Sequence, residues 1–382
     1  MKPRGHLETS KRPFVLIWEL TQACGLACDH CRADAKPDRH PDELTTAEGK
    51  ALLEDAAEFA TGQLVVLSGG DPLVRDDVEE LIAHGDACGL NMTITPSGTH
   101  SLTADRIDAL AEAGLKRMAV SLDGASPETH DAFRGETGSF EETIRAAEDA
   151  RDAGVPLQVN TTVCRGTVGE LPAIRDLLLE IDAVMWSVFF LVPIGRGRVL
   201  EPIDPGEADA VMAWLDEESE RQPFGIKTTE APQYRRVSIQ RGLERASADA
   251  GDASDRPTAN DGVRRRTGIV AGDGFAFVSH TGEVYPSGFL PESAGNVRDR
   301  PITGLYRDSA LFQSLRDRDQ LRGKCGACPY RAVCGGSRSR AYAHTGDPLE
   351  SDPLCPYVPD DYDGPLPWDE PSPGLKGASP GD

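Results

Sequence analysis

The sequence contains no apolar run of 18 or more residues, which is about the length that a membrane-spanning helix requires. Its opening stretch, M-K-P-R-G-H-L-E-T-S, lacks the apolar core of a secretion signal. The first absence excludes a membrane span, and the second argues against export. We therefore expect a soluble, cytoplasmic protein without a membrane partner.

Lysine is scarce, since only 8 of the 40 basic residues are lysines and the other 32 are arginines. With 63 acidic residues the formal net charge is −23, and such a field repels nucleic acid, which we do not expect as a partner. The acidic residues are spread along the chain. This composition resembles that of halophilic proteins from salt-loving archaea, in which surface carboxylates maintain solubility in brine, so the charge itself carries no information on function.

A disulfide framework is not expected either. Nine cysteines in a chain of 382 residues without a secretion signal indicate reduced thiols, which are available to metals. Seven of the nine form two tight groups, and these seven are the candidates for metal binding. The other two, Cys88 and Cys164, we interpret as small buried apolar residues.

Short apolar runs alternate with helical stretches from residue 13 to about residue 190. Three of the helical stretches end on a small residue followed by glycine, which is a common helix stop. Strands that alternate with helices predict right-handed crossovers and a parallel sheet. The predicted fold class is therefore α/β, with either an open doubly wound sheet or a partial barrel. The strand candidates are residues 14–20, 64–67, 91–95, 117–121, 157–162 and 184–190.

Local signals predict several individual elements. Thr45 with Glu48 fits the capping box that begins a helix, and so does Ser139 with Glu142. The other expected elements are a helix over residues 207–220, a mobile loop over 246–261, and a hairpin formed by 275–278 and 283–285.

Three cysteines, Cys24, Cys28 and Cys31, directly follow the first predicted strand. Three thiolates can hold three irons of a four-iron cluster and leave the fourth iron without a protein ligand. Their spacing suits a loop wrapped around a cluster better than the paired C-x-x-C ligands of zinc, although a structural zinc site stays open as the alternative. In either α/β architecture, function is expected at the C-terminal ends of the strands.

The loop that carries these cysteines resembles the cluster-binding signature of radical S-adenosylmethionine (SAM) enzymes. The resemblance implies a partial (β/α)6 TIM-like barrel and a [4Fe-4S] cluster on Cys24, Cys28 and Cys31 whose open iron binds SAM. It also implies that an electron from a donor such as ferredoxin or flavodoxin reaches SAM through the cluster. SAM would then be cleaved to methionine and a 5′-deoxyadenosyl radical.

Further segments resemble the SAM-binding elements of this family. S-G-G-D-P at 68–72 resembles the G-G-E-P element, and its glycines permit close backbone approach to a ligand, with an ordinary turn as the alternative. S-L-D-G at 121–124 and H-D-A-F-R-G at 130–135 resemble strand-end segments that contact SAM. By this resemblance Arg134 would pair with the SAM carboxylate. The SAM-binding residues that the resemblance implies are Gly69, Gly70, Asp71, Pro72, Ser121, Asp123, Arg134 and Asn160.

A second cysteine group lies near the C-terminus and contains Cys325, Cys328, Cys334 and Cys355. Four thiolates can close either an iron–sulfur cluster or a zinc site. The segment resembles the SPASM-type domain of radical SAM enzymes, which carries auxiliary clusters. Ser287 and Ser337 stand where relatives often have cysteine, so the resemblance implies one auxiliary [4Fe-4S] cluster.

Residues 17–24, 189–198 and 334–347 look most like the haem-biosynthesis group of the alternative, sirohaem-dependent pathway. This likeness implies oxidative decarboxylation of tetrapyrrole side chains. We interpret Arg196, Arg198, Arg338 and Arg340 as a basic patch for tetrapyrrole carboxylates, with ordinary surface arginines as the alternative.

Two other functions stay open, namely a peptide-modifying SPASM maturase and a non-catalytic zinc or iron–sulfur binding protein. No single histidine or carboxylate stands out as a catalytic residue. The expected organisation is a radical SAM core over residues 13–222, a connecting segment with an acidic mobile loop over 223–265, a SPASM-like auxiliary cluster domain over 266–359, and a disordered tail over 360–382.

Overall fold

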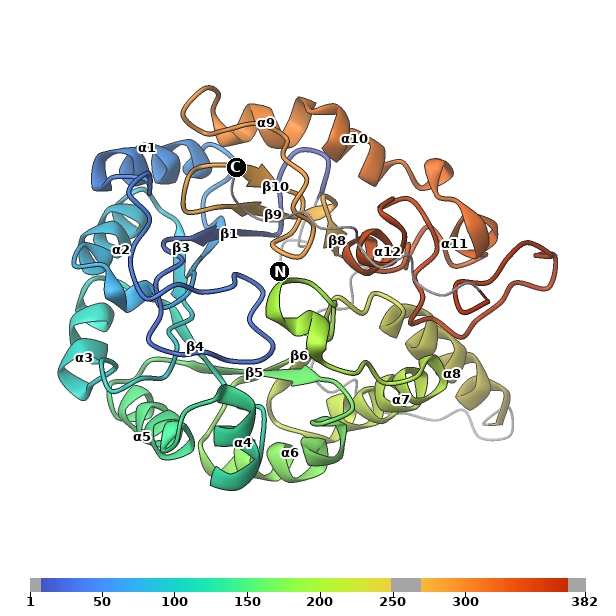
Figure 1. Cartoon of the computed structure of the whole chain (residues 1–382), viewed down its shortest axis with the longest axis horizontal. Coiled ribbons are helices and arrows are strands. Elements are labelled where there is room, and N and C mark those ends of the chain that lie inside the picture. Colours follow the sequence, from blue (N-terminus) through green and yellow to red (C-terminus); the bar gives the residue numbers. More distant parts are fainter. Residues whose placement is uncertain (1–7, 249–268, 370–382) are drawn as a thin grey trace.

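Six parallel strands stand side by side in the sheet in the same order as in the chain. The computed structural model describes residues 8–248 and 269–369, and in these ranges each of the six strands pairs with the next in parallel (Figure 1). This order confirms the α/β class and gives the partial barrel rather than the open doubly wound sheet. The strands are β1 (Val15–Glu19), β2 (Leu64–Ser68), β3 (Asn91–Ile94), β4 (Arg117–Ser121), β5 (Leu157–Val163) and β6 (Met185–Phe190).

Further strands extend both edges of this sheet. β7 (Gly225–Thr229) adds to β6, and β9 (Gly274–Val278) adds in parallel to β1 on the opposite side. The expected hairpin is confirmed, because β10 (Val284–Tyr285) pairs antiparallel with β9, while β8 (Val270–Ala271) also pairs with β9. The C-terminal segment therefore shares one continuous sheet with the first half of the chain. Where one domain ends and the next begins stays a prediction.

Helices form an outer layer around the strands (Figure 1). Up to residue 248 they are α1 (Thr46–Ala57), α2 (Val78–Ala87), α3 (Ala104–Glu112), α4 (Pro127–Arg134), α5 (Ser139–Asp152), α6 (Leu171–Glu180), α7 (Pro205–Arg221) and α8 (Tyr234–Ala248). The C-terminal part adds α9 (Ile302–Asp308), α10 (Ala310–Arg316), α11 (Gly323–Ala327) and α12 (Arg338–Thr345). The described residues also contain four short 3₁₀ helices, η1 (Pro72–Val74), η2 (Val168–Glu170), η3 (Gly195–Val199) and η4 (Arg318–Gln320).

Burial alternates along the strands. On β1, Leu16 and Trp18 are fully buried against the helices, whereas Ile17, on the opposite face, is partly exposed. β2 repeats the pattern, since Val65 and Leu67 are buried while their neighbours are not. Because successive side chains of a strand point to opposite faces, the core lies between sheet and helices, and the inner face of the half-barrel keeps contact with solvent.

One predicted helix start is confirmed and one is wrong. Thr45 and Glu48 form the expected capping box of α1. Ser139 is instead the first residue of α5, because the carboxylate of Asp131 accepts hydrogen bonds from Gly138 N at 2.6 Å and Phe140 N at 2.8 Å. Asp131 thus satisfies the free donors that a serine cap would otherwise take.

Two other expectations about the second half need correction. The helix predicted over 207–220 is confirmed by α7, but α8 continues to Ala248, so residues 246–248 are helical rather than part of a loop. Residues 249–261 of that expected loop lie outside the described residues. The expected disordered tail is wrong for 360–369, where the Trp368 ring lies 4.2 Å from Lys324 Nζ and Pro367 O contacts His344. Residues 370–382 lie outside the described part.

All nine cysteines lie in the described ranges and are free. Cys164 is buried between Phe133 and Leu191, as expected, whereas Cys88 is half-buried beside the main core. Among the described residues, no helix is both long and apolar enough to cross a bilayer.

Close packing between α1 and β1 yields a testable expectation. A Cβ at Gly49 would lie 2.4 Å from the Trp18 ring, which is fully buried and has no room to move. We expect Gly49→Ala to lower the free energy of unfolding by about 1–3 kcal/mol through overpacking. Denaturant titration followed by circular dichroism measures the change.

Gly242→Ala is the matched control, because Gly242 also lies in a helix but has no described atom within 4 Å of its added Cβ. Helix propensity predicts that this substitution stabilises by about 0.5–1 kcal/mol. Equal effects of the two substitutions would contradict the packing of Trp18 on α1.

Candidate functional site

Three of the predicted metal-binding cysteines lie on the loop that leaves the C-terminal end of β1. Cys24 N donates to Lys36 O at 2.9 Å, and Lys36 N donates to Gln22 O at 3.0 Å, so the loop folds back on itself. Backbone N–H groups also point at two sulfurs, with Leu26 N 3.3 Å from Cys24 Sγ and Ala35 N 3.5 Å from Cys31 Sγ. For Cys24 the N–H donor partly offsets burial, which raises the pKa of that thiol.

The glycine turn after β2 packs directly on the start of this cysteine loop. A Cβ at Gly69 would lie 2.4 Å from Thr21 O, and one at Gly70 would lie 2.3 Å from Ala23 O. Gly70 N donates to Thr21 O at 2.8 Å. The two glycines therefore let the turn after β2 pack directly on the backbone of the cysteine loop. Their expected contact with SAM stays a prediction.

Both carboxylate oxygens of Asp71, in the same turn, accept hydrogen bonds from other residues of the protein. Its Oδ1 accepts from Leu73 N at 3.1 Å and caps η1, of which Pro72 is the first residue. Its Oδ2 accepts from Thr99 Oγ1 at 3.2 Å, and burial raises the pKa of its carboxyl. Asp71 therefore orders the turn that holds the cysteine loop.

η3, which follows β6, closes on the cysteine loop from another side. Arg196 N donates to Cys31 O and Arg196 Nε to Cys28 O, both at 3.0 Å. Gly195 has φ +53°, and a Cβ there would lie 2.5 Å from Arg32 O. Only glycine combines this left-handed backbone with such a close contact.

The expected basic patch of four arginines is wrong. Arg338 and Arg340 are buried, and their guanidinium groups donate to backbone carbonyls and, for Arg340, to the Asp352 carboxylate. Arg196 donates to a carbonyl of the cysteine loop and is only partly exposed. Of the four arginines, Arg198 alone is exposed on the surface. These arginines stabilise loops within the protein, because buried carbonyl groups need donors.

Ser121, the last residue of β4, is a neighbour of Asn160 in the middle of β5, and both are partly exposed on the inner face. Asn160 Oδ1 accepts from Gln158 Nε2 at 2.8 Å. Arg134, on α4, donates to Ser97 O at 2.9 Å and lies 3.7 Å from the Asp123 carboxylate. A Cβ at Gly135, the next residue after Arg134, would lie 3.5 Å from Ala27 O, so the end of α4 lies beside the cysteine loop.

His30 was not among the expected site residues. It stacks on Phe133 with a centroid distance of 4.7 Å and an interplanar angle of 12°, and its Nε2 lies 3.9 Å from Asp123 Oδ2. Burial lowers the pKa of His30 to about 4, so the ring is neutral at pH 7. Its place in the sequence between Cys28 and Cys31 is the signal that could have identified it.

Several buried polar atoms around this loop have no hydrogen-bond partner among the described residues. They are His30 Nδ1, Asp123 Oδ2, Arg134 Nε and Arg196 Nη2. Buried polar groups without partners are rare, so four of them beside the same cysteines indicate a site for a polar ligand. Burial also raises the pKa of Cys28 to about 11. A bound iron cation would offset that burial cost, so the residues present fit a cluster.

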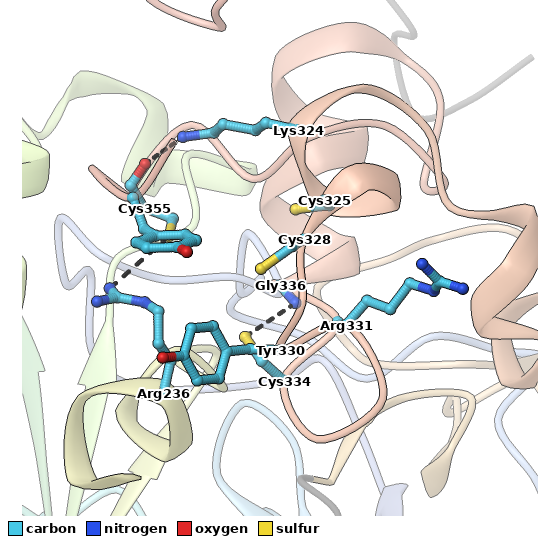
Figure 2. Close-up of a pocket in the computed structure, with 11 residues that line it drawn as sticks. Arg236, Lys324, Cys325, Cys328, Tyr330, Arg331, Cys334, Gly336 and Cys355 are labelled. Atoms are coloured by element: carbon cyan, nitrogen blue, oxygen red, sulfur yellow. Dashed lines mark hydrogen bonds between the residues drawn. The ribbon is translucent and has the colours of Figure 1, made fainter. Parts of the chain in front are cut away.

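The four C-terminal cysteines line one pocket together with Arg236 and Lys324 (Figure 2). In this view the sulfurs of Cys325, Cys328 and Cys334 face a common space, whereas the Arg331 guanidinium points away from it. The structure therefore brings together all four residues of the second predicted metal site.

The surroundings of this pocket are cationic. Arg338 Nη2 lies 3.7 Å from Cys325 Sγ, and Arg236 Nη2 lies 3.8 Å from Cys355 Sγ. Burial raises the pKa of Cys355 to about 11 and that of Cys334 further. Buried cations compensate the negative charge of thiolates, which fits a four-thiolate metal centre.

Neither cysteine group, within the described ranges, has its side chains arranged around a single metal ion. In residues 8–248 and 269–369, no group of three or more His, Cys, Asp or Glu side chains is arranged to hold one metal ion. A four-iron cluster spreads its cysteines around a cube of iron and sulfide, so this finding does not test a cluster.

Comparisons with known proteins agree with this geometry. The sequence model described as "Radical SAM superfamily" matches residues 18–178. The chain is 39% identical to the "AdoMet-dependent heme synthase" of Methanosarcina barkeri over 91% of this chain and 97% of that protein. It is 38% identical to the protein of the same name from Nitratidesulfovibrio vulgaris, over 94% and 96%.

Among solved structures, Streptococcus suis SuiB bound to S-adenosylmethionine superposes with a TM-score of 0.67 at 15% identity, over 91% of this chain and 78% of that one. At this level of identity the likeness shows the fold alone, and it confirms the partial barrel.

The contact between η3 and the cysteine loop can be tested directly. We expect Gly195→Ala to push η3 away from Cys31 and Arg32, since the added Cβ would lie 2.6 Å from Cys31 O and 2.5 Å from Arg32 O. Iron bound after anaerobic reconstitution should fall by about half, because one of two expected clusters would be lost.

Gly169→Ala, in η2, is the control, because no described atom lies within 4 Å of its added Cβ. It should bind iron like the unmodified protein. Full iron content in Gly195→Ala would contradict a role of this contact in the site.

Proposed function

This chain belongs to the radical SAM superfamily, and from that membership we propose that it decarboxylates tetrapyrrole side chains in haem biosynthesis. Support for the substrate class comes from relatives named AdoMet-dependent heme synthase, which match nearly the whole chain. The observation that carries the proposal is the loop of Cys24, Cys28 and Cys31, on which segments after β2 and β6 converge.

We assign the radical SAM cluster to Cys24, Cys28 and Cys31. With SAM bound, such a [4Fe-4S] cluster would supply the electron that cleaves SAM to methionine and the 5′-deoxyadenosyl radical. The chain's own contribution is to hold the loop in place, through Gly69 and Gly70 on one side and Arg196 on the other. Rigid placement matters because reacting atoms must meet at van der Waals distance.

We assign SAM to the region between the cysteine loop and the ends of β4 and β5. Arg134 has one unpartnered buried N–H, at Nε, which can donate to the SAM carboxylate. Ser121 and Asn160 are partly exposed on the inner face and can reach its polar groups. Asp123 Oδ1 accepts from Thr162 N at 2.7 Å, and its Oδ2 lies 3.7 Å from Arg134 Nη1 and 3.9 Å from His30 Nε2, which positions both side chains. The glycine turn and Asp71 form the wall beside Cys24.

We assign an auxiliary [4Fe-4S] cluster to Cys325, Cys328, Cys334 and Cys355. Arg236 and Arg318 each have an unpartnered buried N–H next to this pocket, at Nε and Nη1 respectively. Oxidative decarboxylation leaves an electron once carbon dioxide departs, and a second cluster is a suitable acceptor. The electron for the first cluster would come from a small donor protein such as ferredoxin or flavodoxin.

Metal analysis and substrate assays test this function. We expect about eight irons and eight sulfides after anaerobic reconstitution, and reductive cleavage of SAM. Iron-coproporphyrin should lose carboxyl carbon, which mass spectrometry detects. Zinc without sulfide would contradict the enzymatic proposal, and SAM cleavage without action on tetrapyrroles would favour a peptide-modifying maturase.

Cysteine substitutions separate the two sites. The triple variant Cys24→Ala, Cys28→Ala, Cys31→Ala should lose SAM cleavage and about half of the iron. Cys325→Ala with Cys328→Ala should also lose about half of the iron but still cleave SAM, without forming decarboxylated product. Cys88→Ala, at the end of α2 beside the main core, serves as the control.

A further inference from the structure

The turn at residues 286–290, which follows β10, is tied to the N-terminal cysteine loop. Arg32, the residue after Cys31, donates from Nη1 to Gly288 O at 3.4 Å. Its guanidinium also lies 4.6 Å above the Phe277 ring and pairs with Glu19 at 2.5 Å. The contact with Glu19 and the contact with Phe277 both hold Arg32 against this turn.

The same turn also contacts the segment that follows the opposite edge strand of the sheet. Glu230 follows β7, and three serine hydroxyls donate to its carboxylate. Ser287 and Ser339 reach Oε1 at 3.0 and 2.9 Å, and Ser337 reaches Oε2 at 2.6 Å. We call these three serines with Glu230 the serine cage.

The cage joins parts of the fold that no strand pairing joins. In the described part of the sheet, β7 and β10 are its two edges and do not pair with each other. Ser287 comes from the β10 side, Glu230 from the β7 side, and the other two serines from the start of α12. The half-barrel is therefore held across its open side by side chains at this point.

Glu230 has a strained backbone, with φ +55°. A non-glycine residue in this region is strained, and the conformation persists where surrounding contacts fix it. Arg340 supplies such a contact, since its Nη2 donates to Glu230 O at 2.7 Å. The carboxylate is thus held in one orientation from both its backbone and its side chain.

The cage also reaches the auxiliary cysteines. Ser337 N donates to Asp352 Oδ2 at 2.7 Å, and Asp352 N points at Cys325 Sγ at 3.4 Å. A continuous series of contacts therefore runs from Cys31 through Arg32, residues 286–290 and the cage to Cys325.

We propose that Glu230 is a positioning residue that fixes the distance between the two cysteine sites. The proposal rests on the proposed function, because it needs a cluster at each site. Electron transfer from the substrate to the auxiliary cluster depends on the distance between them. A small displacement caused by a change far from the reacting atoms can lower the rate about 100-fold. Loss of the cage should leave each site able to bind its cluster while weakening the coupling between them.

The test compares reconstituted full-length protein with its Glu230→Ala variant. We expect unchanged iron content and SAM cleavage without substrate, but about tenfold less decarboxylated product per 5′-deoxyadenosine formed, in line with a displacement under 1 Å. Pulsed electron paramagnetic resonance on the two reduced clusters should show a broader distribution of their separation. Glu230→Gln keeps one acceptor oxygen, so its product ratio and its distribution of cluster separations should lie between those of the unmodified protein and of Glu230→Ala.

Glu48→Ala is the matched control. Glu48 also joins distant segments, accepting hydrogen bonds from Thr45 and Arg298, but it lies outside both sites. It should keep the product ratio and the cluster separation of the unmodified protein. Should Glu230→Ala fail to fold, Ser339→Ala removes a single hydrogen bond of the cage and is expected to shift both readouts in the same direction.

The outcomes separate this inference from the proposed function. A Glu230→Ala protein with unmodified product ratio and cluster separation would overturn the positioning role, as would an equal loss in Glu48→Ala. If the unmodified protein cleaves SAM but ignores tetrapyrroles, the substrate proposal fails while the separation measurement still decides the role of Glu230.

Discussion

The candidate site depends on direct contact between backbones around one cysteine loop. Gly69, Gly70 and Gly195 each approach that loop so closely that a single added carbon would meet a carbonyl oxygen at 2.3–2.5 Å. The segments that follow two strands, β2 and β6, thereby define where Cys24, Cys28 and Cys31 can lie. A loop held in this way pays little conformational entropy when it takes up a cluster, because its backbone is already ordered.

Arginine connects this site to the rest of the molecule. In a chain with a formal net charge of −23, arginines still reach the interior, where Arg196, Arg338 and Arg340 donate to backbone carbonyls of loops. The planar guanidinium suits this use, since one side chain can serve several acceptors at once. Arg338 and Arg236 also lie beside the thiols of Cys325 and Cys355, where they would compensate the negative charge that a bound iron–sulfur cluster brings.

Much of the fold followed from local pattern, because strands and helix stops are encoded over a few residues. The six central strands and the capping box at Thr45 lie where the sequence indicates. The failures came from partners distant in sequence. Asp131 replaced Ser139 as a cap, and Asp352 with backbone carbonyls took Arg340 out of the expected surface patch. Neither partner can be recognised from its own neighbours in the chain.

The sequence by itself determined the class of protein and the seven cysteines of interest, since spacing within a short loop is a local property. Only the tertiary structure decided what surrounds them. It placed His30 against Phe133, turned the two glycines toward the cysteine loop, and brought Glu230 together with Ser287, Ser337 and Ser339. These contacts join residues far apart in the chain, and the path of the folded backbone, rather than any local preference, brings such residues within bonding distance.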